Sequence, residues 1–389
     1  TRRSVFFAIM RRTPRSTLFP YTTLFRSDRP APAVEPADTT APDRLCGLTL
    51  LTFKRYYPGL LYPGENPIDP DGRPPEINGL TVNAALDFIN PLNWRRVGET
   101  LDAGVLHLQH WSWPLGLIWR GLIKGYRSSN PNGRVVLTLH NPAMHDSGNG
   151  WLSSCKNAIY RSPLPLCDSI IVHHQGMADA LSASLPGASI SVIEHIPIVP
   201  QALDSIRSEC ETLGLSALRE SLKLPATGRL ALFFGNIRPY KGLDTAIDAL
   251  AQANAKGGDW SLVIAGDAWM DPTTYQRQAE TLGIAESLVW RLGFQPENVL
   301  LKLLMASDAV LLPYRDFASS SGAVTLAGWS GAPVLASDLP GLTTPGLDDI
   351  IRLDPMNAAV WADALKTIAK TRPDADSRRA RIDKYAQAV

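Results

Sequence analysis

The chain has 389 residues, of which 45% are hydrophobic and 19% charged, with a formal net charge of +1 at pH 7. This balance excludes the basic surface that nucleic-acid binding requires, and the sequence has no apolar run of about 18 residues that would span a membrane. The length predicts two domains. Four cysteines without metal or disulfide spacing, Cys46, Cys155, Cys167 and Cys210, indicate a reducing, cytoplasmic setting. Peripheral contact with the inner face of a membrane is compatible with these numbers.

The first 27 residues do not resemble the rest of the chain. They are rich in arginine, and RSTLFPYTTLFRS at 15–27 resembles an in-frame translation of sequencing-adapter DNA. A transit peptide would have a similar composition, rich in Arg and Ser and poor in acidic residues. We favour the adapter and predict that residues 1–27 are non-native and that residues 1–40 make no contact with the folded body. Residues 28–44, rich in Pro and Ala, are predicted to be a disordered lead-in.

Residues 45–200 alternate short apolar runs with helical stretches, such as 177–184, as in a doubly wound parallel sheet. The expected strands are 45–53, 105–109, 135–139, 169–172 and 191–193. Ligands of such sheets bind beyond the carboxyl ends of the strands, where His110, His140, His173 and His195 lie. A single histidine at such a place is more often structural than catalytic. No two histidines have the i, i+4 spacing of a helical zinc site, so no metal is expected.

The second half of the chain repeats this alternation after a predicted linker at 201–227, which is helical and of mixed charge. A second domain is predicted at 228–365, with strands at 230–234, 261–265, 288–292, 309–312 and 334–336 and helices near 244–255, 274–282 and 297–305. A penultimate helix is predicted at 358–370 and a charged helix at 377–389. Residues 366–389 are assigned to a C-terminal helix that the sequence cuts short.

One loop of the second domain carries two cations beside a helix start. In FFGNIRPYKGLD, Phe233–Asp244, Gly235 and Asn236 end a strand, and Arg238 and Lys241 precede the helix. A helix N-terminus offers N–H groups and a favourable dipole to an anion, and Arg adds a planar fork. The spacing alone fits a solvated turn equally well.

A second loop of the same domain, within 312–335, brings small hydroxyl residues to another helix start. Ser319, Ser320, Ser321 and Gly322 precede an apolar helix at 323–329. Serine is a good N-cap and leaves N–H donors for a phosphate. By itself this is an ordinary N-cap. Together with Arg238 and Lys241, a phosphate site that includes Ser320, Ser321 and Gly322 is favoured.

The amino-acid sequence of these segments resembles that of GT-B glycosyltransferases of the family 4 type, over roughly 45–351. Besides FFGNIRPYKGLD, the matching segments are NPLNW at 90–94, LQHWSWP at 108–114, LTLHNPAMHD at 137–146 and IEHIP at 193–197. The resemblance implies an α/β fold of two Rossmann-like domains facing across a cleft, with the acceptor on the side of the first. It also implies that Gly235, Asn236, Arg238 and Lys241 hold the diphosphate of a nucleotide sugar.

In the first domain the resemblance assigns residues to the sugar and the acceptor. His140 matches a histidine that reaches the transferred sugar and is the predicted catalytic residue. His110, Trp111 and His145 are candidate contacts to the sugar or acceptor, and a tryptophan ring offers a stacking face. Packing in the core is the alternative for Trp111.

The chain departs from the family at two acidic positions. Many members carry two glutamates where this sequence has Ala318 and Leu326, although SSSGAV resembles a Ser-Gly version of the motif. Loss of these acids favours an alternative, a weak or inactive GT-B protein that binds sugar nucleotides or glycans as a partner. An epimerase or phosphorylase on the same scaffold is a third reading.

The favoured function is sugar transfer from a nucleotide-diphosphate donor to a glycan or lipid-linked acceptor, as in polysaccharide biosynthesis. The resemblance implies retention of anomeric configuration, with no metal or other cofactor. Departure of the nucleoside diphosphate develops negative charge, which Arg238, Lys241 and helix N–H groups are placed to stabilise.

Overall fold

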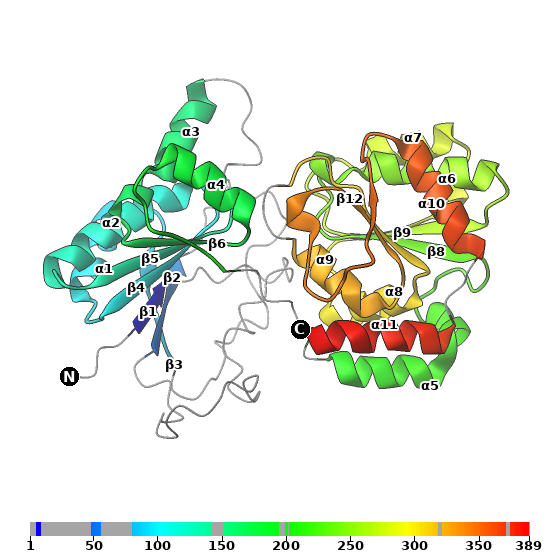
Figure 1. Cartoon of the computed structure of the whole chain (residues 1–389), viewed down its shortest axis with the longest axis horizontal. Helices are drawn as coiled ribbons and strands as arrows, with labels where there is room; N and C mark the ends of the chain where they lie inside the picture. Colours follow the sequence, from blue (N-terminus) through cyan, green and yellow to red (C-terminus); the bar gives the residue numbers. More distant parts are fainter. Residues whose placement is uncertain are drawn as a thin grey trace. The chain divides into compact units, whose positions relative to one another are not determined.

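The computed structural model describes residues 5–8, 48–55, 80–141, 151–193, 199–200, 202–317, 321–370 and 374–388. They form two compact units, each built on a parallel sheet (Figure 1). The described residues up to Ile193 belong to the first unit and those from Val199 onward to the second. The predicted α/β class with two Rossmann-like domains is confirmed.

The first unit contains a seven-stranded sheet in the order β3-β2-β1-β4-β5-β6-β7, with every pair parallel. Its strands are β1 Val5–Ala8, β2 Leu48–Arg55, β3 Leu80–Asp87, β4 Val105–His110, β5 Arg134–Leu139, β6 Ser169–Val172 and β7 Ile190–Val192. Its helices are α1 Pro91–Thr100, α2 Pro114–Ser129, α3 Trp151–Arg161, the short η3 Leu164–Leu166 and α4 Gln175–Ser184. Helices α1 and α2 can pack closely because Gly125 has no side chain. A Cβ there would lie 2.0 Å from the Arg95 carbonyl oxygen.

Strand β1 corrects the prediction for the start of the chain. Val5–Ala8 pairs with β2 on one side and with β4 on the other. The expectation that residues 1–40 make no contact with the fold is therefore wrong for these four residues. A run as short as VFFA carries no recognisable period, yet its backbone can pair with strands on both sides. Residues 9–47 lie outside the described part of the chain.

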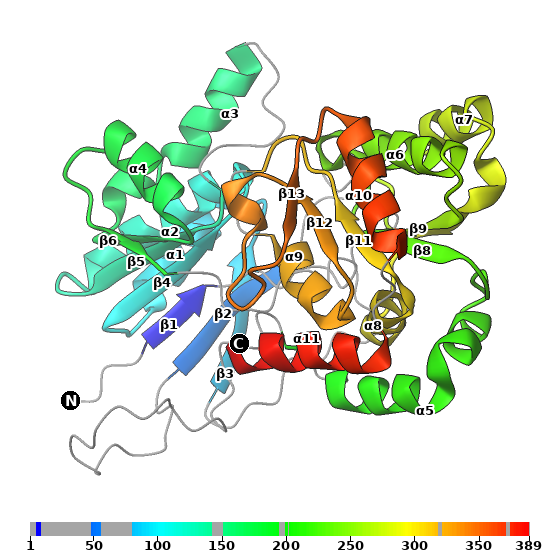
Figure 2. The same cartoon turned by 45° about the vertical axis from the view of Figure 1, so that its right-hand side comes forward.

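The second unit contains a six-stranded parallel sheet in the order β10-β9-β8-β11-β12-β13 (Figure 2). Its strands are β8 Arg229–Phe234, β9 Trp260–Gly266, β10 Leu288–Leu292, β11 Ala309–Leu312, β12 Val334–Ser337 and β13 Ile351–Leu353. The chain runs outward from β8 to β10 and then returns to β11 on the other side of β8. This is the strand order of a doubly wound nucleotide-binding sheet, and its topological switch point lies between β8 and β11.

Helices cover both faces of this second sheet. They are α5 Leu203–Ser221, α6 Leu243–Ala255, α7 Thr273–Thr281, α8 Glu297–Ala306, α9 Gly322–Ala327, α10 Ala358–Lys370 and α11 Ala375–Ala388, with one-turn segments η4 Pro239–Lys241, η5 Ala285–Ser287, η6 Gly328–Ser330 and η7 Pro340–Leu342. Helix α10 packs against α6, and α5 packs against α8. Both views show α5 and α11 side by side (Figures 1 and 2).

The segment predicted as a linker, 201–227, is for the most part helix α5 of the second unit. Leu203, Ile206 and Leu218 are buried in its core. Arg207 of α5 lies 2.9 Å from Asp383 of α11. The helical character was predicted correctly, but the linker assignment is wrong, because the apolar side of the helix covers a core while Asp204, Glu209 and Glu211 are exposed. Helix α11 also belongs to this unit, where Tyr385 packs on Trp329 at 4.7 Å between ring centroids.

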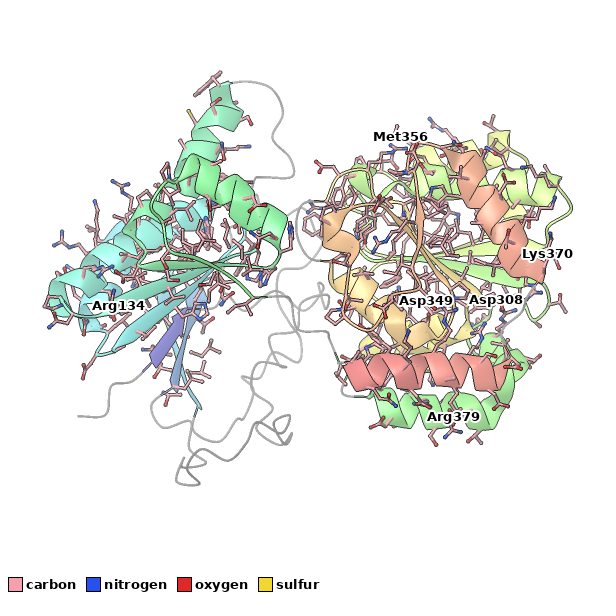
Figure 3. All side chains as sticks on the ribbon, in the orientation of Figure 1. Arg134, Asp308, Asp349, Met356, Lys370 and Arg379 are labelled. Carbon is pink, nitrogen blue, oxygen red and sulfur yellow. The ribbon has the colours of Figure 1, made fainter. Side chains whose placement is uncertain are left out.

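Asp308, labelled in Figure 3, connects the outer helices α5 and α11 to the sheet through hydrogen bonds. Its carboxylate is fully buried and accepts hydrogen bonds from Arg219 of α5 at 2.6 Å and from Arg378 of α11 at 3.1 Å. It also accepts one from the Leu230 amide of β8 at 2.9 Å. Because buried charges are costly unless they are paired and hydrogen-bonded, this arrangement fixes where α5 and α11 dock.

Candidate functional site

Two loops of the second unit meet at the switch point of its sheet. One follows β8 and leads through η4 into α6, and the other follows β11. The Arg315 amide donates to the Tyr240 carbonyl at 2.7 Å. Gly242 has φ of 68°, and a Cβ there would lie 2.0 Å from the Pro313 carbonyl oxygen, so only glycine permits this approach. The segment that follows β11, at Pro313 and Arg315, thus packs directly against the loop that carries Lys241.

Lys241 is a buried cation in this place. Its side chain is 5% exposed, and its Nζ lies 5.0 Å from the centre of the Tyr314 ring. Burial lowers the pKa of Lys241; Tyr240 acts in the opposite direction and the Arg238 charge adds to the lowering. Among the residues that the structure describes, no carboxylate forms an ion pair with it. A buried ammonium without an anion is unfavourable, and a bound phosphate would relieve that cost.

Arg238 stands beside Lys241 and is held by an aromatic ring. Its guanidinium lies 3.9 Å from the centre of the Trp269 ring. Helix α6 begins directly after this pair, and no side chain caps its first turn. The Gly235 amide donates to the Ala265 carbonyl of β9 at 2.9 Å, so its N–H is already used within the sheet. Asn236 is half-buried.

The second wall is described only in part. Ser321 caps α9, with its Oγ accepting from the Ala323 amide at 3.3 Å, and Gly322 is buried. Ser320 and Ala318 lie outside the described residues. Leu326 is buried in the core of the second unit, so a side chain at this position of α9 faces the core.

Sequence reasoning missed two residues that join these loops. Arg315 forms an ion pair with Asp244 of α6, and its guanidinium also lies 3.3 Å from the Thr245 hydroxyl. Tyr314 is buried beneath Lys241, and burial raises the pKa of its hydroxyl. The only signal in the sequence was that Tyr314 and Arg315 follow closely after an apolar strand, 309–312, which was predicted correctly.

His140 of the first unit lies at the carboxyl end of β5 among other polar side chains. It is 6% exposed, and its Nε2 lies 2.7 Å from Gln109 Oε1. Its Nδ1 lies 3.3 Å from His173 Nε2. The edge of Trp111 approaches at 6.2 Å between ring centroids. Trp111 is half-buried against the core of this unit.

His110 does not occupy the place expected of a sugar or acceptor contact. Its ring is fully buried, stacks on Tyr160 at 4.3 Å, and has Nε2 2.8 Å from the Tyr160 carbonyl oxygen. Burial lowers the pKa of His110 to about 4, so the ring is neutral at pH 7. The expectation is corrected: His110 is a core residue, because α3 covers the end of β4. His145 lies outside the described part of the chain.

The described residues contain neither a metal-binding cluster nor a membrane-spanning helix. No group of three or more His, Cys, Asp or Glu side chains in these ranges is arranged to hold a metal ion. None of the helices in the same ranges combines the length and the apolar character needed to cross a membrane.

Comparison with known proteins identifies a domain within the chain. Residues 228–371 match the family described as glycosyl transferases group 1. The D-inositol 3-phosphate glycosyltransferase of Corynebacterium glutamicum is 29% identical over 222 residues, 55% of this chain and 48% of that protein. The 2-deoxystreptamine glucosyltransferase of Streptomyces kanamyceticus is 29% identical over 188 residues, 48% of this chain and 46% of that protein. The chain thus spans about half the length of the curated relatives that it matches.

Solved structures resemble a larger part of the chain. Anabaena HepE, crystallised with UDP and glucose, aligns over 100% of this chain and 94% of its own, with a TM-score of 0.62 and 15% identity. Sucrose-phosphate synthase of Thermosynechococcus elongatus aligns over 88% and 84%, with a TM-score of 0.58 and 16% identity. At these identities the likeness shows the fold alone, and it agrees with the GT-B class predicted from the sequence.

Proposed function

We propose that this chain, with its glycosyl transferases group 1 domain, is a glycosyltransferase that binds a nucleotide-diphosphate sugar at the switch point of its second sheet. The observation that carries the proposal is Lys241, a buried ammonium beside Arg238 without a carboxylate partner among the described residues. A diphosphate is the ligand chemistry that such a pair of cations fits. The first turn of α6 adds backbone donors next to them.

In this proposal the two units contribute different parts of the reaction. Arg238 and Lys241, with the Gly322 amide, stabilise the charge that develops as the nucleoside diphosphate leaves. The Ser321 amide, expected from the sequence to take part, instead donates to the Gly341 carbonyl at 2.9 Å. His140 orients the transferred sugar by a hydrogen bond. The transfer proceeds with retention and without a metal, since the two cations supply the positive charge. HepE was crystallised with UDP and glucose, which makes UDP-glucose the first donor to test.

The acceptor is proposed to be a hydroxyl of a glycan or a lipid-linked sugar. The matched relatives carry names that specify inositol 3-phosphate and 2-deoxystreptamine, so small polyols belong in the same panel. Product analysis by mass spectrometry identifies the acceptor, and NMR of the product's anomeric proton decides retention.

Two single variants test the division of roles. Lys241→Ala removes a charged hydrogen bond of about 1.5–3 kcal/mol, so the Kd for UDP should rise roughly 10- to 150-fold. His140→Ala should bind UDP like the parent while turnover falls about 100-fold, because the lost contact serves only the reacting geometry. If the parent binds UDP-glucose but transfers to no acceptor, the chain is a binding partner. If no sugar nucleotide binds, the proposed function is wrong.

A further inference from the structure

Each of the two cations of the candidate phosphate site lies against an aromatic ring from a neighbouring strand end. Arg238 and Lys241 follow β8, which lies between β9 and β11 in the sheet (Figure 2). The Arg238 guanidinium lies over the ring of Trp269, which follows β9, with Cζ 3.9 Å from the ring centre. Lys241 Nζ lies 5.0 Å from the centre of the ring of Tyr314, which follows β11. The two rings thus come from the strands on either side of β8.

Backbone hydrogen bonds fix Trp269 beside the residue that precedes Arg238. The Ile237 amide donates to the Asp267 carbonyl at 2.7 Å, and the Trp269 amide donates to the Ile237 carbonyl at 3.1 Å. These bonds continue the parallel pairing of β8 and β9 by one bridge, between Ile237 and Ala268. Ile237 is fully buried in the core of the second unit. The backbone of Trp269 is therefore held in a fixed register with Arg238.

An aromatic ring can hold a cation without cancelling its charge. The π face of tryptophan attracts a guanidinium electrostatically, yet the ring has no net charge that would compete with a phosphate. A guanidinium that is stacked by its face keeps its N–H donors in its own plane, where a phosphate can accept two of them at once. A flexible arginine loses conformational freedom when a ligand orders it, and that cost lowers the affinity. An arginine that is ordered before binding avoids this cost.

We propose that Trp269 is a positioning residue whose ring stacks on the Arg238 guanidinium and orders it in the free protein, so that a diphosphate meets a cation already in place. This inference rests on the proposed function. The N–H donors of Arg238 contact the diphosphate, and the Trp269 ring acts only through Arg238. All the contacts that carry the inference lie within the second unit.

Proton–nitrogen NMR of the arginine side chains at pH 6 tests the stack in the free, full-length protein, with Arg238 assigned from the spectrum of Arg238→Lys. We expect the ring current of Trp269 to shift the Arg238 Nε–H proton upfield. Trp269→Phe keeps a ring and should retain part of this shift, whereas Trp269→Leu should abolish it. Trp290→Leu removes a half-buried tryptophan from β10 of the same unit. This variant is the control and should leave the Arg238 signal unchanged.

Calorimetric titration with inorganic pyrophosphate and with UDP supplies the second readout. Trp269→Leu should raise both Kd values roughly 2- to 10-fold, which is the cost of ordering one arginine side chain on binding, and Trp269→Phe should stay closer to the parent. In an Arg238→Ala background, Trp269→Leu should change either Kd by less than about 2-fold, because the ring then has no guanidinium to order. Trp290→Leu should leave both Kd values unchanged.

Three results would overturn the inference. The first is an Arg238 Nε–H signal that is not shifted upfield in the parent, or that keeps its shift in Trp269→Leu. The second is an equal loss of affinity in the Arg238→Ala background, since Trp269 would then act without Arg238. The third is a loss of affinity for UDP but not for pyrophosphate, which would mean that the ring stacks on the nucleobase.

Two further outcomes remain decisive. If Trp269→Leu does not fold, the spectrum of the parent and the response of Trp269→Phe still decide. If UDP-glucose and other sugar nucleotides fail to bind to the parent, the proposed function fails. The spectrum of the free protein then still decides whether Trp269 orders Arg238.

Discussion

Replacing Lys241 by methionine should make the protein more stable and a poorer binder of nucleotide at the same time. The ammonium of Lys241 is 5% exposed and has no carboxylate partner in the described ranges. Methionine has a similar length and no charge, so it fills the same space beneath the loop without the desolvation cost. A substitution that raises stability while it lowers ligand affinity identifies a residue whose role is to bind the ligand.

The structure sets the size of both effects. A desolvated ammonium costs several kcal/mol, and the Tyr314 ring at 5.0 Å returns at most about 2 kcal/mol as a cation–π contact. After repacking, a gain of about 0.5–2 kcal/mol is expected, or roughly 1–8 °C in the Tm of the second unit. The Kd for UDP should rise roughly 10- to 150-fold, which corresponds to a lost charged hydrogen bond of about 1.5–3 kcal/mol.

Differential scanning calorimetry and titration with UDP measure the two quantities. The lowered pKa of Lys241 also predicts a pH dependence. The unfolded chain binds more protons than the native one between that lowered pKa and the usual value near 10.4. The free energy of unfolding of the parent should therefore rise with pH through this window. The amount by which Lys241→Met exceeds the parent in this free energy should become smaller. A Lys241→Met protein that is less stable and binds UDP like the parent would refute the reasoning.

Three further outcomes are expected. Asp308→Asn should lower the free energy of unfolding, measured in urea, by about 3–5 kcal/mol, because it breaks a buried ion pair with Arg219. The control Asp349→Asn, at an exposed pair with Arg381, should change that free energy by less than about 1 kcal/mol. Equal effects of the two variants, whose positions are labelled in Figure 3, would contradict this expectation. Deleting residues 1–8 should lower the Tm of the first unit, since β1 pairs on both sides, and an unchanged Tm would take that strand out of the fold. Transfer should persist in EDTA, and activity lost in EDTA and restored by magnesium or manganese would contradict the metal-free assignment.

Strands with an apolar run were the part of the fold that the sequence could predict, inside a sheet or at its edge. Strands β6, β10 and β11 and helix α10 have the bounds expected from their apolar pattern. Two edge strands, β3 and β13, were missed for a physical reason. Strand β3 exposes Thr81, Asn83 and Ala84, and β13 has three half-buried residues. Strands with so little burial carry no apolar run, and nothing local distinguishes them from loops.

At the candidate site the loops could be predicted, but the partners within them could not. Strand ends placed Arg238, Lys241 and Ser321 at one edge of the second sheet. Arg315 and Asp244 lie 71 residues apart and Gln109 and His140 31 apart, so no local pattern joins either pair. His110 and His140 end neighbouring strands and look alike in the sequence. Only the stacking of Tyr160 of α3 on His110 distinguishes that core residue from His140, the candidate catalytic residue.

In the proposed reaction, Lys241 and His140 have different parts because their side chains differ in how far their polar groups are satisfied within the described chain. Lys241 is a buried charge that lacks an anion among the described residues, so a diphosphate gains free energy there whether or not the sugar is reacting. His140 already has a neighbour at each ring nitrogen, so a sugar hydroxyl exchanges one contact for another and gains little in the ground state. Only interactions that strengthen in the transition state raise kcat. Affinity for the donor should therefore come from the second unit, and selection of the reacting geometry from the first.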